Sequence, residues 1–183
     1  MSLSRLTLLL AVAIIAVPIH AQVGIYGKSD VTHFSVPSNN FESTATYYGP
    51  GAGIYYDFLH LGPVSLGADL RGDFLYSNGQ KYRSVLGGLR LAVKVPATPI
   101  RPYVQGSVGD GGPSHSGLNG SGTIYSNKFQ YEVLGGLDVS IFPHVEWRVA
   151  EFGYGRVSGI SSGAPAPKGS LVFGGTGIVV RLP

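Results

Sequence analysis

A strict alternation of apolar and polar side chains constrains this chain more than any other feature of its sequence. Residues 64–76 have the sequence VSLGADLRGDFLY, in which apolar side chains alternate with serine, glycine, aspartate and arginine. A period of two is typical of a β-strand whose two faces differ in chemistry. The pattern therefore predicts a sheet with one apolar face and one polar, charged face.

Eight segments have this strand character, and clusters of glycine, proline, asparagine and serine separate them. They cover residues 22–30, 47–58, 64–76, 82–95, 101–109, 128–141, 145–157 and 170–182. Most exceed the ~5–6 residues usual for soluble strands and suit the ~9–11 that cross a bilayer at a tilt. Short connections at 59–63, 96–100 and 142–144 alternate with long ones at 31–46, 110–127 and 158–169. Asn78-Gly79 predicts a tight hairpin turn, and the whole plan is typical of an up-and-down transmembrane barrel.

Composition narrows the class of protein in the same direction. The 183 residues include 28 glycines, only 13% are charged, and there is no cysteine. So many glycines disfavour a helical bundle, because each costs ~1 kcal/mol in a helix interior relative to alanine. Without cysteine, a disulfide scaffold and a cysteine-based zinc site are both excluded. The formal charge of +3 is small and dispersed, so we expect no nucleic-acid partner.

The N-terminal segment has the features of a secretory signal peptide. Arg5 precedes an apolar run from Leu6 to Val17, which is shorter than the ~20 residues of a membrane-spanning helix. We predict that residues 1–21 are a signal peptide cleaved after Ala21, and that residues 22–183 form one barrel domain. No apolar run of spanning length follows in the sequence, so membrane insertion, if any, has to use strands.

The direction in which the apolar face points decides the environment. A soluble barrel needs many lysines and glutamates outside, and this chain has five and four. We therefore expect hydrocarbon outside and charges in a lumen that side chains of an eight-stranded barrel can fill. The predicted lumen acids are Asp57, Asp69, Asp73, Glu132, Asp138 and Glu151. The bases predicted to neutralise them are Lys28, Arg71, Arg90, Lys94, Arg148 and Arg181.

Two local features refine this arrangement. In residues 145–157 strict alternation would turn Glu151 toward lipid, so we predict a β-bulge near Ala150 that returns it to the lumen. Aromatic residues near the strand ends predict two interfacial girdles. One consists of Phe58, Tyr103, Phe142 and Trp147, and the other of Tyr48, Tyr76, Tyr82, Phe129 and Tyr154.

Together these features resemble the small OmpA/OmpX-type outer-membrane β-barrels. The resemblance covers residues 22–183 and includes glycine-rich strand centres such as residues 49–53 and the final segment 177–183. It implies an all-β, eight-stranded antiparallel up-and-down transmembrane β-barrel in the bacterial outer membrane. It also implies a monomer that contacts outer-membrane lipid and the barrel-assembly machinery. One departure is that this sequence ends in Leu182-Pro183, whereas family members often end in an aromatic residue.

Chemistry-bearing motifs are scarce. His33, His60, His115 and His144 are isolated and lack the paired spacing of a metal site, so we predict no metal and no cofactor. His33 near Ser35, or His115 between two serines, leaves open a lipid-hydrolysing barrel, although proximity alone does not activate a nucleophile. The predicted lumen charges are the main candidate site. They either form ion pairs that stabilise the barrel or line a pore.

We therefore predict a non-enzymatic outer-membrane barrel with a structural or surface-interaction role, a closed lumen and extracellular long loops. A narrow porin-like channel is the first alternative, and a soluble secreted barrel that binds an apolar ligand is the second. Nothing in the loops identifies their ligand.

Overall fold

The computed structural model describes residues 22–37, 42–116, 123–125, 128–158 and 169–182. The predicted signal peptide, residues 1–21, lies outside the described residues. No helix formed by the described residues is long and apolar enough to cross a membrane. The strands are β1 (Gln22–Pro37), β2 (Glu42–Leu61), β3 (Val64–Ser77), β4 (Gln80–Val93), β5 (Ile100–Ser116), β6 (Thr123–Tyr125), β7 (Lys128–Phe142), β8 (Val145–Val157) and β9 (Gly169–Leu182).

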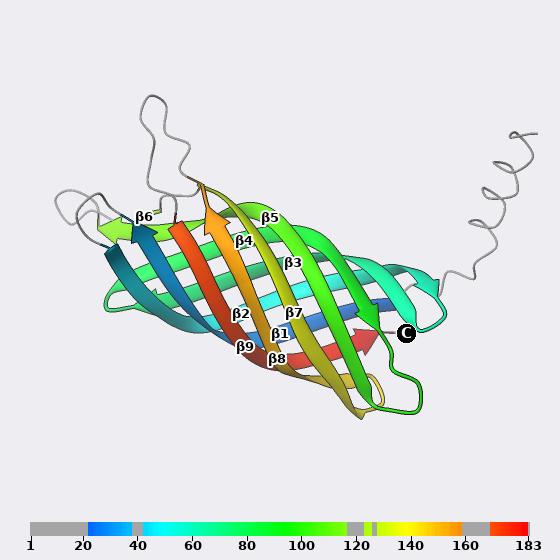
Figure 1. The fold of residues 1–183 in the computed structure, drawn as a ribbon. Helices are drawn as coiled ribbons and strands as arrows, with labels where there is room; N and C mark the ends of the chain where they lie inside the picture. The colour runs from blue at the N-terminus through cyan, green and yellow to red at the C-terminus, as the bar shows by residue number, and fades with distance from the viewer. Residues whose placement is uncertain (1–21, 38–41, 117–122, 126–127, 159–168, 183) are drawn as a thin grey trace, which may run out of the picture.

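Eight of these strands form a closed antiparallel barrel. Neighbours in sequence pair from β1 to β5, β5 pairs with β7, β7 with β8, and β8 with β9, while β1 pairs with β9. The short β6 pairs only with the end of β5. Figure 1 shows the tilted strands winding around a common axis. The predicted eight-stranded up-and-down barrel is confirmed.

The two ends of the barrel differ in their connections. At the short-turn end, residues 62–63, 94–99 and 143–144 join β2 to β3, β4 to β5, and β7 to β8. The opposite end, here called the long-loop end, carries the other connections (Figure 1). Asn78 (φ 42°) and Gly79 (φ 81°) form the predicted tight turn between β3 and β4 at the long-loop end.

Part of what the sequence predicts as loop is strand. β1 continues to Pro37 and β2 starts at Glu42, with residues paired up to these ends, so the predicted loop at 31–46 is wrong over 31–37 and 42–46. The remaining residues of that prediction, 38–41, lie outside the described residues. β5 likewise extends to Ser116, inside the predicted loop at 110–127. Serine and threonine are abundant in the β1–β2 extension and resemble loop composition, but a strand accommodates them when partners are available on a neighbouring strand.

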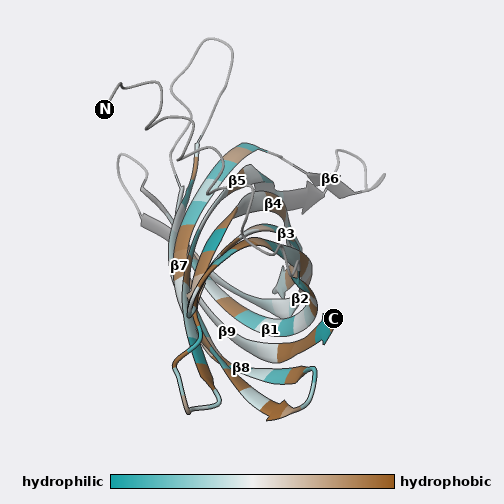
Figure 2. Cartoon of the chain, turned by 90° about the vertical axis from the view of Figure 1, so that its right-hand side faces the viewer, coloured by the Kyte–Doolittle hydropathy of each residue, from teal (hydrophilic) through white to brown (hydrophobic). Residues whose placement is uncertain are grey.

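The apolar face of the sheet points outward. Large apolar side chains stand exposed on successive strands around the wall, and Figure 2 shows hydrophobic and hydrophilic residues alternating along the strands. They include Ile25, Ile54, Leu70, Val85, Leu89, Val104, Val133, Phe152, Val172 and Ile178. An exposed apolar surface of this extent is typical of a wall in contact with lipid.

The predicted bulge in β8 is confirmed. Arg148 pairs with Asp138 and Ala150 with Leu137 on β7, which leaves Val149 without a partner there. The extra residue puts both Arg148 and Glu151 inside the barrel. On the other side, the Thr176 hydroxyl donates to the Arg148 carbonyl at 2.8 Å and stabilises the bulge.

Two aromatic residues assigned to the girdles lie in the lumen instead. Tyr82 and Tyr103 are each only 3% exposed, so their placement in an outer girdle is wrong. The other predicted girdle residues, such as Phe142 and Tyr48, are exposed on the wall. Tyrosine is compatible with both the lumen and the outer girdle, because its ring is apolar and its hydroxyl can form a hydrogen bond with a polar partner. Whether a tyrosine lies in the lumen or on the outer wall therefore follows from its position in the strand alternation and not from its residue type.

Candidate functional site

The lumen contains a dense set of ionisable side chains. Among the described residues, eight carboxylates and five cations are buried, each exposing 7% or less of its surface, and Arg181 is partly buried beside them. They are Lys28, Asp30, Asp57, Asp69, Arg71, Asp73, Arg90, Arg101, Glu132, Asp138, Glu146, Arg148 and Glu151. Charges so well shielded from water require partners inside the barrel.

Glu151 is the centre of the network. Its carboxylate accepts hydrogen bonds from Lys28 Nζ at 3.1 Å, Arg71 Nη1 at 3.0 Å and Arg148 Nη1 at 3.3 Å. The hydroxyl of Tyr103 donates to it as well, at 2.6 Å. These donors come from β1, β3, β8 and β5, so one carboxylate joins opposite sides of the barrel. The bulge in β8 is what places Glu151 there.

Stacked arginine and tyrosine side chains fill the space next to Glu151. The guanidinium of Arg90 lies 4.1 Å from the ring centres of both Tyr55 and Tyr103. That of Arg148 lies 4.2 Å from the ring of Tyr26. Both arginines also donate to Asp138, at 2.5 Å from Arg90 Nη2 and 3.0 Å from Arg148 Nε. A planar guanidinium can stack on a ring and bind a carboxylate at once, which lysine cannot do.

Toward the long-loop end, acids outnumber cations. Lys28 Nζ lies 3.0 Å from Asp30 and 3.3 Å from Asp73. Glu132 accepts from Gln130 Nε2 at 2.6 Å, and its second oxygen has no hydrogen-bond partner in the described part of the chain. The cavity between these groups has a volume of only about 10 Å³. Side chains therefore occupy almost all of the lumen at this level.

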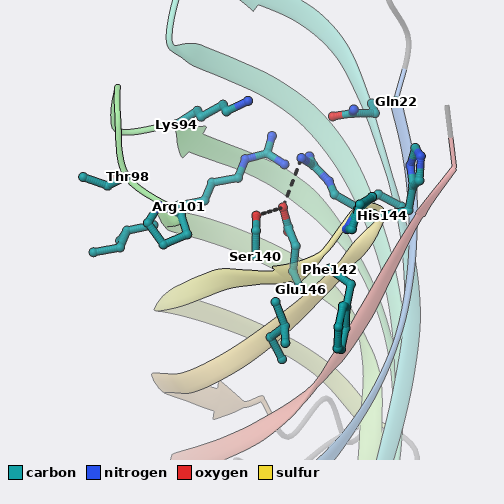
Figure 3. Close-up of a pocket in the computed structure, with 13 residues that line it drawn as sticks. Gln22, Lys94, Thr98, Arg101, Ser140, Phe142, His144 and Glu146 are labelled. Atoms are coloured by element: carbon teal, nitrogen blue, oxygen red, sulfur yellow. Dashed lines mark hydrogen bonds and ion pairs between the residues drawn. The ribbon is translucent and has the colours of Figure 1, made fainter.

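At the short-turn end the lumen opens into a mouth. One oxygen of Asp57 accepts from Arg101 Nη2 at 2.6 Å and from Arg181 Nη2 at 3.3 Å. Arg181 Nη1 also donates to Glu146, at 3.3 Å. A cavity of about 390 Å³ lies above these groups, and Figure 3 shows Lys94, Arg101, Ser140 and Glu146 directed into it.

The structure places nearly all the predicted lumen charges inside the barrel. Asp57, Asp69, Arg71, Asp73, Arg90, Glu132, Asp138, Arg148 and Glu151 are buried, and Arg181 borders the mouth. Lys94 follows Val93, the last residue of β4, and it is exposed and lines the mouth rather than the filled part of the lumen. Lys94 has the same strand parity as the buried Arg90 and Ala92, and it is exposed because it lies at the open end of the barrel.

The prediction omits three buried charges, namely Asp30, Arg101 and Glu146. Each shares strand parity with a lumen residue that is two positions away: Asp30 with Lys28, Arg101 with Tyr103, and Glu146 with Arg148. Parity alone could have identified them. All three stand at or near the ends that the sequence assigns to their strands.

The histidines whose side chains the structure describes form no recognisable catalytic or metal site. Nδ1 of His33 lies 3.1 Å from the Thr46 hydroxyl across the β1–β2 hairpin. The side chain of His115 is outside the described residues. Within the part of the chain that the structure describes, no group of three or more histidine, aspartate or glutamate residues could hold a metal ion.

A closed eight-stranded barrel with an apolar wall and a charged interior has the architecture of a transmembrane β-barrel. Its fold is that of the small OmpA/OmpX-type barrels. No protein-family model matches the sequence, and no curated protein matches it significantly.

Solved structures share this fold at low sequence identity. Neisserial surface protein A is 16% identical, with a TM-score of 0.60, covering 85% of this chain and 96% of that one. Ail, the attachment invasion locus protein of Yersinia pestis, is 13% identical, with a TM-score of 0.53, covering 88% of this chain and 99% of Ail. Both are small outer-membrane barrels, and the likeness shows that this chain has their fold.

Proposed function

We propose that this protein is a non-conducting, non-enzymatic monomer whose rigid barrel carries surface-interacting segments at its long-loop end. The observation that carries the proposal is the filled lumen. Side chains from β1, β3, β5 and β8 meet at Glu151, and the arginines next to it are at most 1% exposed. An ion crossing this level would have to displace several paired charges, each of which costs several kcal/mol to leave unpaired.

The long-loop end supports the surface-interaction role. The β1–β2 hairpin extends beyond β3, since β2 starts at Glu42 but pairs with β3 only from Tyr48 onward. The β3-facing edge of residues 42–47 has no strand partner among the described residues. Free strand edges provide backbone donors and acceptors for an incoming extended segment.

Planar-bilayer recording tests whether the lumen is closed. We expect purified, refolded protein to give no discrete conductance steps, because the hub around Glu151 blocks the lumen. A gel that compares boiled and unboiled samples checks folding, since a folded barrel should migrate differently from the boiled chain. Stable conductance steps that change in Arg71→Ala or Arg90→Ala would support the porin-like alternative instead.

An epitope insertion tests the proposed orientation. We expect a tag placed between Asn78 and Gly79 to be detected by antibody on intact cells, because this turn is exposed at the long-loop end. The matched control is the same tag at Thr98, which is exposed at the short-turn end and should require permeabilised cells. The opposite labelling pattern would place the long loops in the periplasm.

A further inference from the structure

The mouth at the short-turn end is a single basin lined by cations. Two cavities, of about 390 and 220 Å³, share Gln22, Lys94, Arg101 and Arg181 among their lining residues. The turn after β4 and the turn between β7 and β8 form the rim, and the latter contributes His144. The basin therefore opens outward above the filled part of the lumen.

The cations in this basin exceed the available acids. Arg101 and Arg181 share one oxygen of Asp57, and Arg181 also pairs with Glu146. Lys94 makes no ion pair with any described residue. Three cations thus face two carboxylates, and two guanidinium groups are held close together on the same oxygen. Like charges in such proximity favour an additional anion between them.

Hydrogen-bond donors also remain unused there. Arg101 is only 5% exposed, and its Nε and Nη1 have no hydrogen-bond partner among the described residues. A buried donor without a partner is costly, so an acceptor that reaches the Arg101 guanidinium from the basin lowers that cost. The donor set of guanidinium, ammonium and amide groups matches the oxygen-rich surface of a phosphate group. Figure 3 shows Lys94, Arg101 and Gln22 directed toward the same space.

We propose that this basin binds a phosphate group, with Lys94, Arg101 and Arg181 as its cationic ligands. The volume of about 390 Å³ exceeds what a phosphate ion fills and leaves room for the substituents of a phosphate ester. In the orientation proposed above, the basin faces the periplasm, where both phospholipid headgroups and soluble phosphate are chemically suitable sources. The binding itself does not depend on that orientation or on a closed lumen.

Titration calorimetry on the folded protein in octyl glucoside, a detergent without phosphate, tests the proposal. We expect inorganic phosphate to bind with 1:1 stoichiometry, and Lys94→Gln to weaken binding about tenfold, the loss typical of one hydrogen bond to a charged group. Lys94 is exposed beyond the end of β4, so its replacement should leave the barrel folded. Arg101→Gln should weaken binding as well, provided that the boiled-sample gel shows a folded barrel.

Arg156→Gln is the matched control, because it removes one positive charge from an exposed position on β8 toward the long-loop end. It should bind phosphate like the wild type. Absence of 1:1 binding, or equal weakening by Lys94→Gln and Arg156→Gln, overturns the proposal. Glycerophosphoglycerol, a soluble headgroup diester, identifies the source: tighter binding of the diester indicates a phospholipid headgroup, and tighter binding of inorganic phosphate indicates soluble phosphate. Failure of both ligands to bind refutes the site.

Discussion

Glu151→Gln is expected to lower the free energy of unfolding by about 3–5 kcal/mol, the usual effect of removing one partner from a buried ion pair. The wild-type carboxylate balances Lys28, Arg71 and Arg148 at once, and a neutral amide leaves all three cations short of negative charge. Urea titration in lipid vesicles measures the effect, with the fluorescence of the single tryptophan, Trp147, as the readout.

Glu132→Gln is the matched control for this substitution. Glu132 is also buried, but it makes no ion pair with a described residue and contacts Gln130 instead. Its neutralisation removes a negative charge from the part of the lumen where acids outnumber cations. We therefore expect little loss of stability, or a small gain. Similar losses in both variants would show that Glu151 is not the hub of the network.

Leu70→Arg is expected to destabilise the barrel in a bilayer by about 2–4 kcal/mol, the range for a cation on the lipid face at the midplane. Leu70 lies in the middle of β3, points outward and is 53% exposed. Folding into vesicles, followed by gel mobility across a urea series, gives the change in stability.

The control is Leu61→Arg, at the end of β2, where the side chain is 59% exposed. Near the interface the same change should cost only about 0–1 kcal/mol, because the guanidinium can reach water. A soluble barrel gives a different result, since arginine at either exposed position would be tolerated equally. Equal stability of the two variants would therefore contradict the lipid-facing wall.

The alternation, the turn residues between the segments and the scarcity of lysine and glutamate predicted the strand count and the inward direction of most charges. This prediction succeeded because a barrel wall has only two faces, and lipid on one side leaves the other side for charge. The bulge in β8 followed from the same reasoning, since Glu151 could not be accommodated in hydrocarbon.

Other features depend on partners that are distant in sequence. The extension of β1 and β2 through residues 31–37 and 42–47 is paired along its length, and its composition is that of a loop. Lys94 has lumen parity but is exposed, because parity does not tell how far a strand end lies from the open mouth of the barrel. Which cation meets which acid, such as Lys28 with Glu151, depends on the stagger between strands on opposite sides of the barrel, and no local pattern specifies it.

The pairing of β1 with β9 sets the order in which this barrel can be built. Val23 is opposite Leu182 and Ser35 opposite Ser170, so the strand synthesised first finds its second neighbour in the strand synthesised last. Until β9 exists, β1 and β8 each have an open edge whose backbone groups hydrocarbon cannot solvate. Stepwise insertion of hairpins would expose those edges to lipid. We therefore expect these edges to be kept from the hydrocarbon until β9 is available, so that insertion accompanies the closing of the barrel.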